Sequence, residues 1–246
     1  MRELDVEPVL FGSLLAVFKE VMNGSATTTK IVALGDSLTL GETGFVFSGE
    51  AAVPYPQCLQ FFAEEYSRSR QLGVNVEVLN KGVNGDLTSG MLERFPSVVV
   101  DERADYVIVL GGTNDIGWGL DRSQIIHNLA AMYDAAQNNG IGAVACSIPS
   151  ILGFDEAIPA RLDLNRAIKR EAEKRNIPFL DLFTATADRR NKRLLEDYSA
   201  DGLHLNSKGY QRIGKYVFDE WLKPVLSHEA RRDYPQRGAN SVQGSL

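Results

Sequence analysis

The sequence predicts an α/β protein, a three-layer sandwich built around a five-stranded parallel sheet. Five short apolar runs alternate along the chain with segments that carry helix signals. This alternation is typical of a parallel sheet with helices on both faces. The runs show little polar alternation, which is expected for strands that are covered on both sides. At 246 residues, the chain is long enough for one such domain with a sizeable core.

The predicted elements follow one another in a regular order. Strands are expected at residues 31–34, 74–79, 106–110, 143–148 and 178–182, which are rich in β-branched or other apolar residues. Helices are expected to begin at Pro56, at Asp121 or Ser123, at Leu162, and at Asn206 or Ser207. Proline suits the first turn of a helix, and aspartate, serine and asparagine cap helix starts. The last three helices are expected to end at 138–140, at Arg175 and near Lys223-Pro224.

One central domain, residues 30–226, accounts for all of these elements. Residues 1–29 are expected to form a helical extension packed on that domain. The apolar run at 9–22 has acidic flanks instead of the positive ones of a signal peptide, and it is too short to span a bilayer. Residues 227–246 are polar and lack periodicity, which predicts a mobile tail.

Charge and cysteine content exclude several classes of partner. The net charge of -6 argues against nucleic acid or an anionic membrane surface as a standing partner, because both require a positive surface. Cys58 and Cys146 are too few for a disulfide scaffold and do not have the spacing of metal ligands. Cys146 lies in an apolar run and is expected to be a reduced thiol in the core. A cytoplasmic protein fits these features better than a secreted one.

Polar residues follow the predicted strands at the points where the strands end. Ser37 follows the first strand, Gly85 the second and Asn114 the third, while Asp201 and His204 lie beyond the fifth. Ligands of open parallel sheets bind outside the carboxyl ends of the strands. The sheet is therefore expected to bring all five residues toward one edge.

Three of these residues can form a serine nucleophile with its base. A serine hydroxyl attacks poorly until a histidine takes its proton and a carboxylate orients that histidine. Asp201 precedes His204 by three residues, a separation that one turn brings together. The other histidines, His127 and His228, belong to no motif. Simpler interpretations exist: Ser37 as a helix cap, Asp201 as a turn residue and His204 as a residue near a helix start.

Four segments of the chain resemble the SGNH, or GDSL-type, hydrolase family. In chain order they are Gly35-Asp36-Ser37-Leu38, Asn80-Lys81-Gly82-Val83-Asn84-Gly85-Asp86, Gly111-Gly112-Thr113-Asn114-Asp115 and Asp201-Gly202-Leu203-His204. The resemblance spans residues 30–222, and it is specific because four blocks agree in order. It implies a flavodoxin-like form of the predicted fold and hydrolysis of carboxylic esters through an acyl-enzyme.

The resemblance implies a catalytic role for three residues. Ser37 would be the nucleophile, and His204 would be the general base and then the acid that protonates the leaving alcohol. Asp201 would orient the imidazole and stabilise its charged form. The nearby Asp197 is a competing carboxylate, but the family's Asp-x-x-His block selects Asp201.

The resemblance also implies an oxyanion hole. Its donors would be the backbone N–H of Ser37 together with Gly85 and Asn114, which would stabilise the charge of a tetrahedral intermediate. Gly82 competes with Gly85, and the family pattern Asn-x-Gly-x-x-Gly-Asp points to Gly85. Taken alone, Asn114 is easily a loop residue.

The implied substrate is a small-molecule ester, with small or short-acyl esters favoured, and neither a cofactor nor a metal is implied. Two alternatives use the same site: transfer of the acyl group to an alcohol, and hydrolysis of acyl thioesters or lysophospholipids. A distant alternative is a non-catalytic module that holds phosphate or a nucleotide at the first strand-to-helix turn. The apolar residues Phe45, Ile116 and Trp118 flank the blocks. Two interpretations stay open for them, the lining of an acyl or alcohol pocket and ordinary packing, and they are not counted among the site residues.

Overall fold

The structure, a computed structural model, describes residues 27–43 and 52–232. Its centre is a five-stranded sheet with the strand order β2-β1-β3-β4-β5, in which every neighbouring pair is parallel. The strands are β1 (Thr27–Gly35), β2 (Val74–Gly82), β3 (Tyr106–Leu110), β4 (Gly142–Cys146) and β5 (Phe179–Leu180). This is the strand order of flavodoxin-like folds, so the predicted fold is confirmed.

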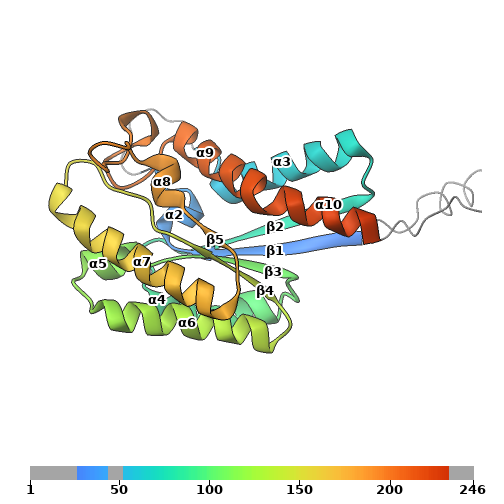
Figure 1. Cartoon of the computed structure of the whole chain (residues 1–246), viewed down its shortest axis with the longest axis horizontal. Helices are drawn as coiled ribbons and strands as arrows, with labels where there is room; N and C mark the ends of the chain where they lie inside the picture. Colours follow the sequence, from blue (N-terminus) through green and yellow to red (C-terminus); the bar gives the residue numbers. More distant parts are fainter. Residues whose placement is uncertain (1–26, 44–51, 233–246) are drawn as a thin grey trace, which may run out of the picture.

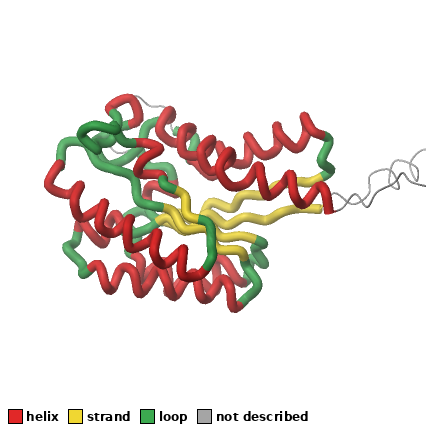
Figure 2. Tube along the Cα trace, viewed as in Figure 1, coloured by secondary structure: helices red, strands yellow, loops and turns green. Residues whose placement is uncertain are grey.

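Helices cover both faces of the sheet and form the outer layers of the sandwich (Figure 1 and Figure 2). One layer contains α3 (Tyr55–Arg70), α9 (Ser207–Val217) and α10 (Lys223–Arg232). The other contains α4 (Thr88–Phe95), α6 (Arg122–Asn138) and α7 (Ile158–Arg175). The interior strand β1 is fully buried from Ile31 to Leu34, as expected for a strand between two helical layers.

Short helices follow the carboxyl ends of three strands. They are α2 (Ser37–Leu40) after β1, α5 (Thr113–Gly117) after β3 and α8 (Leu182–Thr186) after β5. Figure 1 shows α2 and α5 at the same end of the sheet as the loop that leads into α9. The topology therefore gathers these turns at one edge.

Of the five strands, only β3 matches its predicted bounds. The first begins at Thr27, because polar residues before the apolar run pair with β2 from Thr27↔Val74 onward. Strand β5 is only two residues long, since Asp181 ends it by capping α8, where its carboxylate accepts a hydrogen bond from Thr184 N at 3.0 Å. The apolar runs in the sequence therefore mark neither the start of β1 nor the end of β5.

The helical layers hold two features that the sequence did not predict. Helix α4 continues into a π-helical segment, Pro96–Val100. The final helix does not end near Lys223-Pro224, as predicted. It passes through a π-helical segment, Phe218–Leu222, into α10. Pro224 lies in the first turn of α10, where the missing N–H of proline is tolerated.

Regular elements extend past both predicted bounds of the central domain, 30–226. Residues 27–29 belong to β1, and residues 227–232 belong to α10. Ser227 anchors α10 to α3, because its Oγ lies 2.8 Å from the hydroxyl of Tyr66. The predicted extension at 1–26 and the rest of the predicted tail, 233–246, lie outside the described residues.

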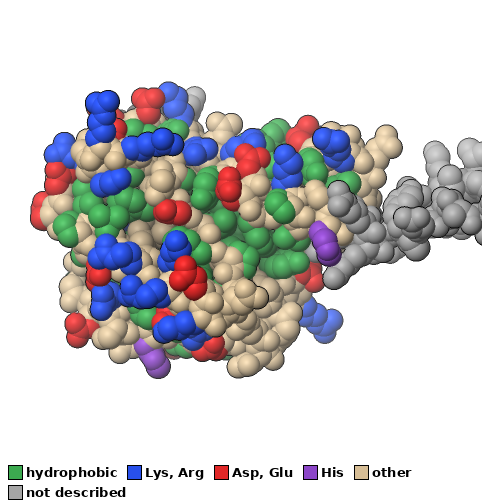
Figure 3. All heavy atoms as spheres, viewed as in Figure 1, with side chains coloured by type: hydrophobic (Ala, Val, Ile, Leu, Met, Phe, Trp, Pro, Cys, Tyr) green, Lys and Arg blue, Asp and Glu red, His purple; other side chains and the backbone are tan. Residues whose placement is uncertain are grey.

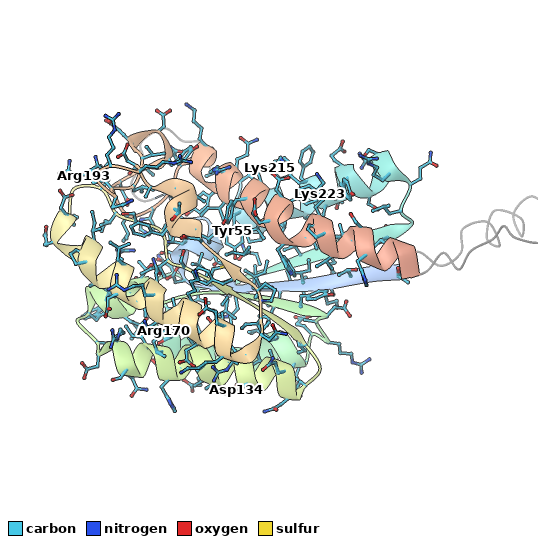
Figure 4. All side chains as sticks on the ribbon, in the orientation of Figure 1. Tyr55, Asp134, Arg170, Arg193, Lys215 and Lys223 are labelled. Carbon is cyan, nitrogen blue, oxygen red and sulfur yellow. The ribbon has the colours of Figure 1, made fainter. Side chains whose placement is uncertain are left out.

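Helices α3 and α9 pack closely on one face of the sheet. A Cβ added at Gly214 would lie 2.6 Å from Cys58 Cβ and 3.0 Å from the carbonyl oxygen of Tyr55, so glycine permits this approach. Figure 4 shows Tyr55 in the interior, and its side chain is fully buried. This packing holds α9, and the loop before it, against the sheet.

The visible surface carries charges of both signs. Figure 3 shows Lys and Arg side chains interspersed with Asp and Glu on one face of the molecule. Among the described residues, no helix is long and apolar enough to cross a membrane. Cys146 is buried in β4, as predicted, and both cysteines are free.

Candidate active site

The turn after β1 places Ser37 at the start of α2. Asp36 caps this helix, because its Oδ1 accepts a hydrogen bond from Leu38 N at 2.9 Å. Gly35 cannot carry a side chain, since a Cβ there would lie 2.1 Å from Thr39 Oγ1 and 2.6 Å from the carbonyl oxygen of Leu110. The turn is therefore fixed on both sides of a serine that is only 3% exposed.

The loop before α9 brings Asp201 and His204 to this turn. Asp201 Oδ1 accepts hydrogen bonds from the backbone N–H groups of Leu203 and His204, at 3.0 and 2.7 Å. Asp201 Oδ2 lies 2.8 Å from His204 Nδ1, and His204 Nε2 lies 3.1 Å from Ser37 Oγ. The three predicted residues thus form one continuous hydrogen-bonded chain.

The protonation states follow from these contacts. Partial burial opposes ionisation of Asp201, but hydrogen bonds from the His204 ring and from the two backbone N–H groups outweigh it and hold the pKa of Asp201 below its ordinary value. An ionised Asp201 favours the tautomer with a proton on His204 Nδ1. Nε2 is then free to accept the proton of Ser37 Oγ.

Gly85 lies on the loop after β2, and Asn114 lies in α5, the short helix that follows β3. Gly85 has a φ of 73°, a conformation that favours glycine, and a Cβ there would meet nothing within 4 Å. The side chain of Asn114, in α5, donates a hydrogen bond from Nδ2 to the carbonyl oxygen of Asp86 at 2.9 Å. Gly82 lies at the end of β2 against α2, where a Cβ would approach Leu40 N to 2.1 Å. Close packing accounts for Gly82, and the open backbone position is that of Gly85.

Two buried ionisable residues near the Ser37 turn, Asp36 and Arg161, were missed by the sequence analysis. The Asp36 side chain is fully buried, and burial raises its pKa to about 7 although Leu38 N–H and the charges of Arg161 and His204 oppose the shift. Arg161, in α7, is 3% exposed and donates from Nη1 to the carbonyl oxygen of Pro149 at 2.9 Å. Arg161 resembles a surface residue in the sequence, because only tertiary contacts bury it.

An apolar groove of 610 Å³ adjoins the hydrogen-bonded chain. Asn114, Asp201 and Arg161 contribute to its lining, together with apolar side chains. Trp118 and Phe154 both line the groove and are 77% and 59% exposed. Of the two interpretations of Trp118, its exposure and its place in the groove favour pocket lining over ordinary packing. Ile116 is partly buried against the core, and Phe45 lies outside the described residues.

Within residues 27–43 and 52–232, no group of three or more His, Cys, Asp or Glu side chains is arranged to hold a metal ion.

A family model and individual relatives agree on the class of protein. Residues 33–212 match the model of the GDSL-like Lipase/Acylhydrolase family, and the chain belongs to that family. An arylesterase from Vibrio mimicus is 23% identical over 220 residues, which cover 85% of this chain and 96% of the relative. The chain is thus a carboxylic ester hydrolase, as predicted, and not a non-catalytic phosphate-binding module.

Solved structures share the fold. A lipase/acylhydrolase from Enterococcus faecalis is 23% identical, with a TM-score of 0.62, over 85% of this chain and 100% of that one. An acetylxylan esterase from Geobacillus stearothermophilus is 18% identical, with a TM-score of 0.64, over 79% of this chain and 94% of that one. At these identities the likeness establishes the fold alone.

Proposed function

We propose that Ser37, His204 and Asp201 are the catalytic triad of this esterase. The observation that carries the proposal is the hydrogen-bonded chain from Ser37 Oγ through the imidazole to the Asp201 carboxylate. Ser37 Oγ attacks the ester carbonyl carbon while His204 Nε2 takes its proton. The imidazolium then protonates the alcohol oxygen as the ester C–O bond breaks, which leaves an acyl-enzyme.

The second half of the reaction reverses these roles. Water attacks the acyl carbon, and His204 Nε2 accepts a proton from that water. The bond to Ser37 Oγ then breaks, the serine regains its proton from the imidazolium, and the carboxylic acid leaves. Asp201 keeps the imidazole oriented and stabilises its positive charge in both halves.

Three N–H donors stabilise the oxyanion formed in each half-reaction. They are the backbone N–H groups of Ser37 and Gly85 and the side-chain amide of Asn114. One Nδ2 hydrogen of Asn114 is directed to the carbonyl of Asp86, which orients the amide and leaves its second hydrogen for the substrate. The Ser37 N–H is at the start of α2 and has no acceptor within that helix.

The apolar groove beside Asn114 binds the acyl group. Its exposed aromatic side chains, Trp118 and Phe154, offer contact area to a short alkyl chain, each buried CH₂ contributing about 0.8 kcal/mol. Contacts with the groove therefore favour short acyl groups of a few carbons, such as butanoyl, over the acetyl group. We place the enzyme in a reducing compartment, the cytoplasm, because Cys58 and Cys146 are both free.

Replacement of Ser37 tests the triad directly. Ser37→Ala should lower turnover of nitrophenyl butanoate by several orders of magnitude, because the hydroxyl is the covalent nucleophile. An alkyl fluorophosphonate should label the wild type once, at Ser37. Ser89→Ala, which changes an exposed serine of the neighbouring helix α4, is the matched control and should keep both properties. A folded Ser37→Ala variant with near-normal turnover, or an adduct mapped to another serine, would refute the assignment.

A further inference from the structure

Helix α4 contacts all three segments that carry Ser37, Gly85 and Asn114. At its start, the Thr88 backbone N–H donates to the buried carboxylate of Asp115, at 3.1 Å to Oδ2, and Asp115 directly follows Asn114. Nearer its end, Arg94 extends toward the other two segments. The position of this helix therefore governs how the three segments lie relative to one another.

Arg94 makes two hydrogen bonds at the oxyanion site. Its Nε donates to Asp86 Oδ2 at 2.9 Å, and its Nη2 donates to the carbonyl oxygen of Gly35 at 3.0 Å. Asp86 follows Gly85 directly, and Gly35 precedes Ser37 by two residues. The side chains of Arg94 and Asp86 are only 20% and 11% exposed, so solvent screens their attraction less than that of a surface pair.

Asp86 links this ion pair to Asn114. Its side chain is held by Arg94, while its carbonyl oxygen accepts the Asn114 Nδ2 hydrogen bond. Asp86 also has no room to move toward the helix, because Gly90 packs against it, and a Cβ at Gly90 would lie 2.3 Å from Asp86 Oδ1. One guanidinium thus fixes the loop that bears Gly85 and that accepts the side-chain hydrogen bond of Asn114.

We propose that Arg94 is a positioning residue for the oxyanion hole. By joining Asp86 to the carbonyl of Gly35, it sets the separation between the Gly85 and Asn114 donors and the nucleophile turn. Oxyanion donors act only when they are held at the position of the developing charge, so loosening them weakens transition-state binding more than substrate binding. The proposal rests on the proposed function, since it presumes attack by Ser37.

The test is a double-mutant cycle with Asn114. Arg94→Met, which keeps most of the side-chain length, should lower kcat about 10–100-fold with less than about a 3-fold change in KM. Arg94→Lys retains the charge and should recover part of kcat. Arg94 acts partly through Asn114, so the two substitutions should not be independent. The fold-loss of kcat in the double variant should be at least about 5-fold smaller than the product of the fold-losses in the two single variants.

Arg175→Met is the matched control for a purely structural effect. Arg175 is 17% exposed and ion-paired with Asp134 and Glu171, so its loss should lower stability but leave kcat unchanged. The proposal is overturned if Arg94→Met keeps normal kcat while Ser37→Ala is inactive. If Arg94→Met fails to fold, a normal kcat in Arg94→Lys overturns it instead. A double variant whose fold-loss of kcat equals the product of the two single losses would also overturn the proposal. Activity in Ser37→Ala would instead refute the proposed function.

Discussion

Replacing Asp36 by asparagine should stabilise the protein at alkaline pH far more than at acidic pH. The Asp36 carboxyl is fully buried beside the nucleophile, and its Oδ2 finds no hydrogen-bond donor within the described part of the chain. Burial raises its pKa to about 7, against the favourable effects of Leu38 N–H, Arg161 and His204, and Asp115 adds to the increase. Asparagine preserves the cap on Leu38 N through its own carbonyl oxygen and removes the charge.

The magnitude follows from linkage between ionisation and folding. The folded-state pKa of Asp36, about 7, lies above the unfolded value of 3.8. The protonated carboxyl therefore contributes stability that is fully present below pH 3.8 and is lost as the pH rises through 7. The whole loss is about 4 kcal/mol, at 1.36 kcal/mol for each pKa unit, and about 3 kcal/mol of it falls between pH 5 and pH 8.

Urea denaturation at pH 5 and pH 8 measures this difference. The gap in unfolding free energy between Asp36→Asn and wild type should increase by about 3 kcal/mol from pH 5 to pH 8, which is about a 1 M change in the relative urea midpoints. Asp181→Asn is the control, because Asp181 also caps a short helix but is only partly buried, and its gap should stay nearly constant. A gap for Asp36→Asn that is equal at both pH values would refute the reasoning.

Two further predictions concern packing and specificity. Gly214→Ala should lower the unfolding free energy by about 1–3 kcal/mol, because the new methyl group would collide with Cys58. Gly117→Ala, at a helical glycine with open space around it, should not do so in the same thermal unfolding experiment. The ratio of kcat/KM for nitrophenyl butanoate to that for nitrophenyl acetate should be about 2–10-fold smaller in Trp118→Ala than in the wild type, since the substitution removes part of the acyl groove. Phe61→Ala, at an exposed aromatic residue outside that groove, should leave the ratio unchanged, and an equal effect of both variants would argue against the groove.

The sequence predicted best those features that depend on local pattern and parallel topology. The bounds of β3 match the prediction because a clean apolar run stands between polar residues and glycines. The approach of Ser37 to His204 followed from placing residues at the carboxyl ends of parallel strands. Asn206 caps α9 as predicted, and its side chain accepts from Gly209 N at 3.0 Å.

Features that depend on tertiary contacts were not predicted. Helix α4 contains Gly90 and is followed by Pro96, both of which weaken a helix signal, although its position links the site loops. Arg94 reaches Gly35 across 59 positions of the chain, a pairing that no local pattern indicates. The π-helical segment before Pro224 likewise allows a helix to continue where proline normally predicts its end.

The wide separation of Ser37 and His204 along the chain has a consequence for biosynthesis. The two residues are 167 positions apart, and His204 lies on the loop that precedes α9, so it is synthesised well after Ser37. On the proposed assignment, a nascent chain that has formed only β1 to β4 carries the nucleophile without its base, and the Ser37 hydroxyl stays unreactive. Esterase activity then requires that the loop before α9 has reached the turn after β1, where His204 meets Ser37.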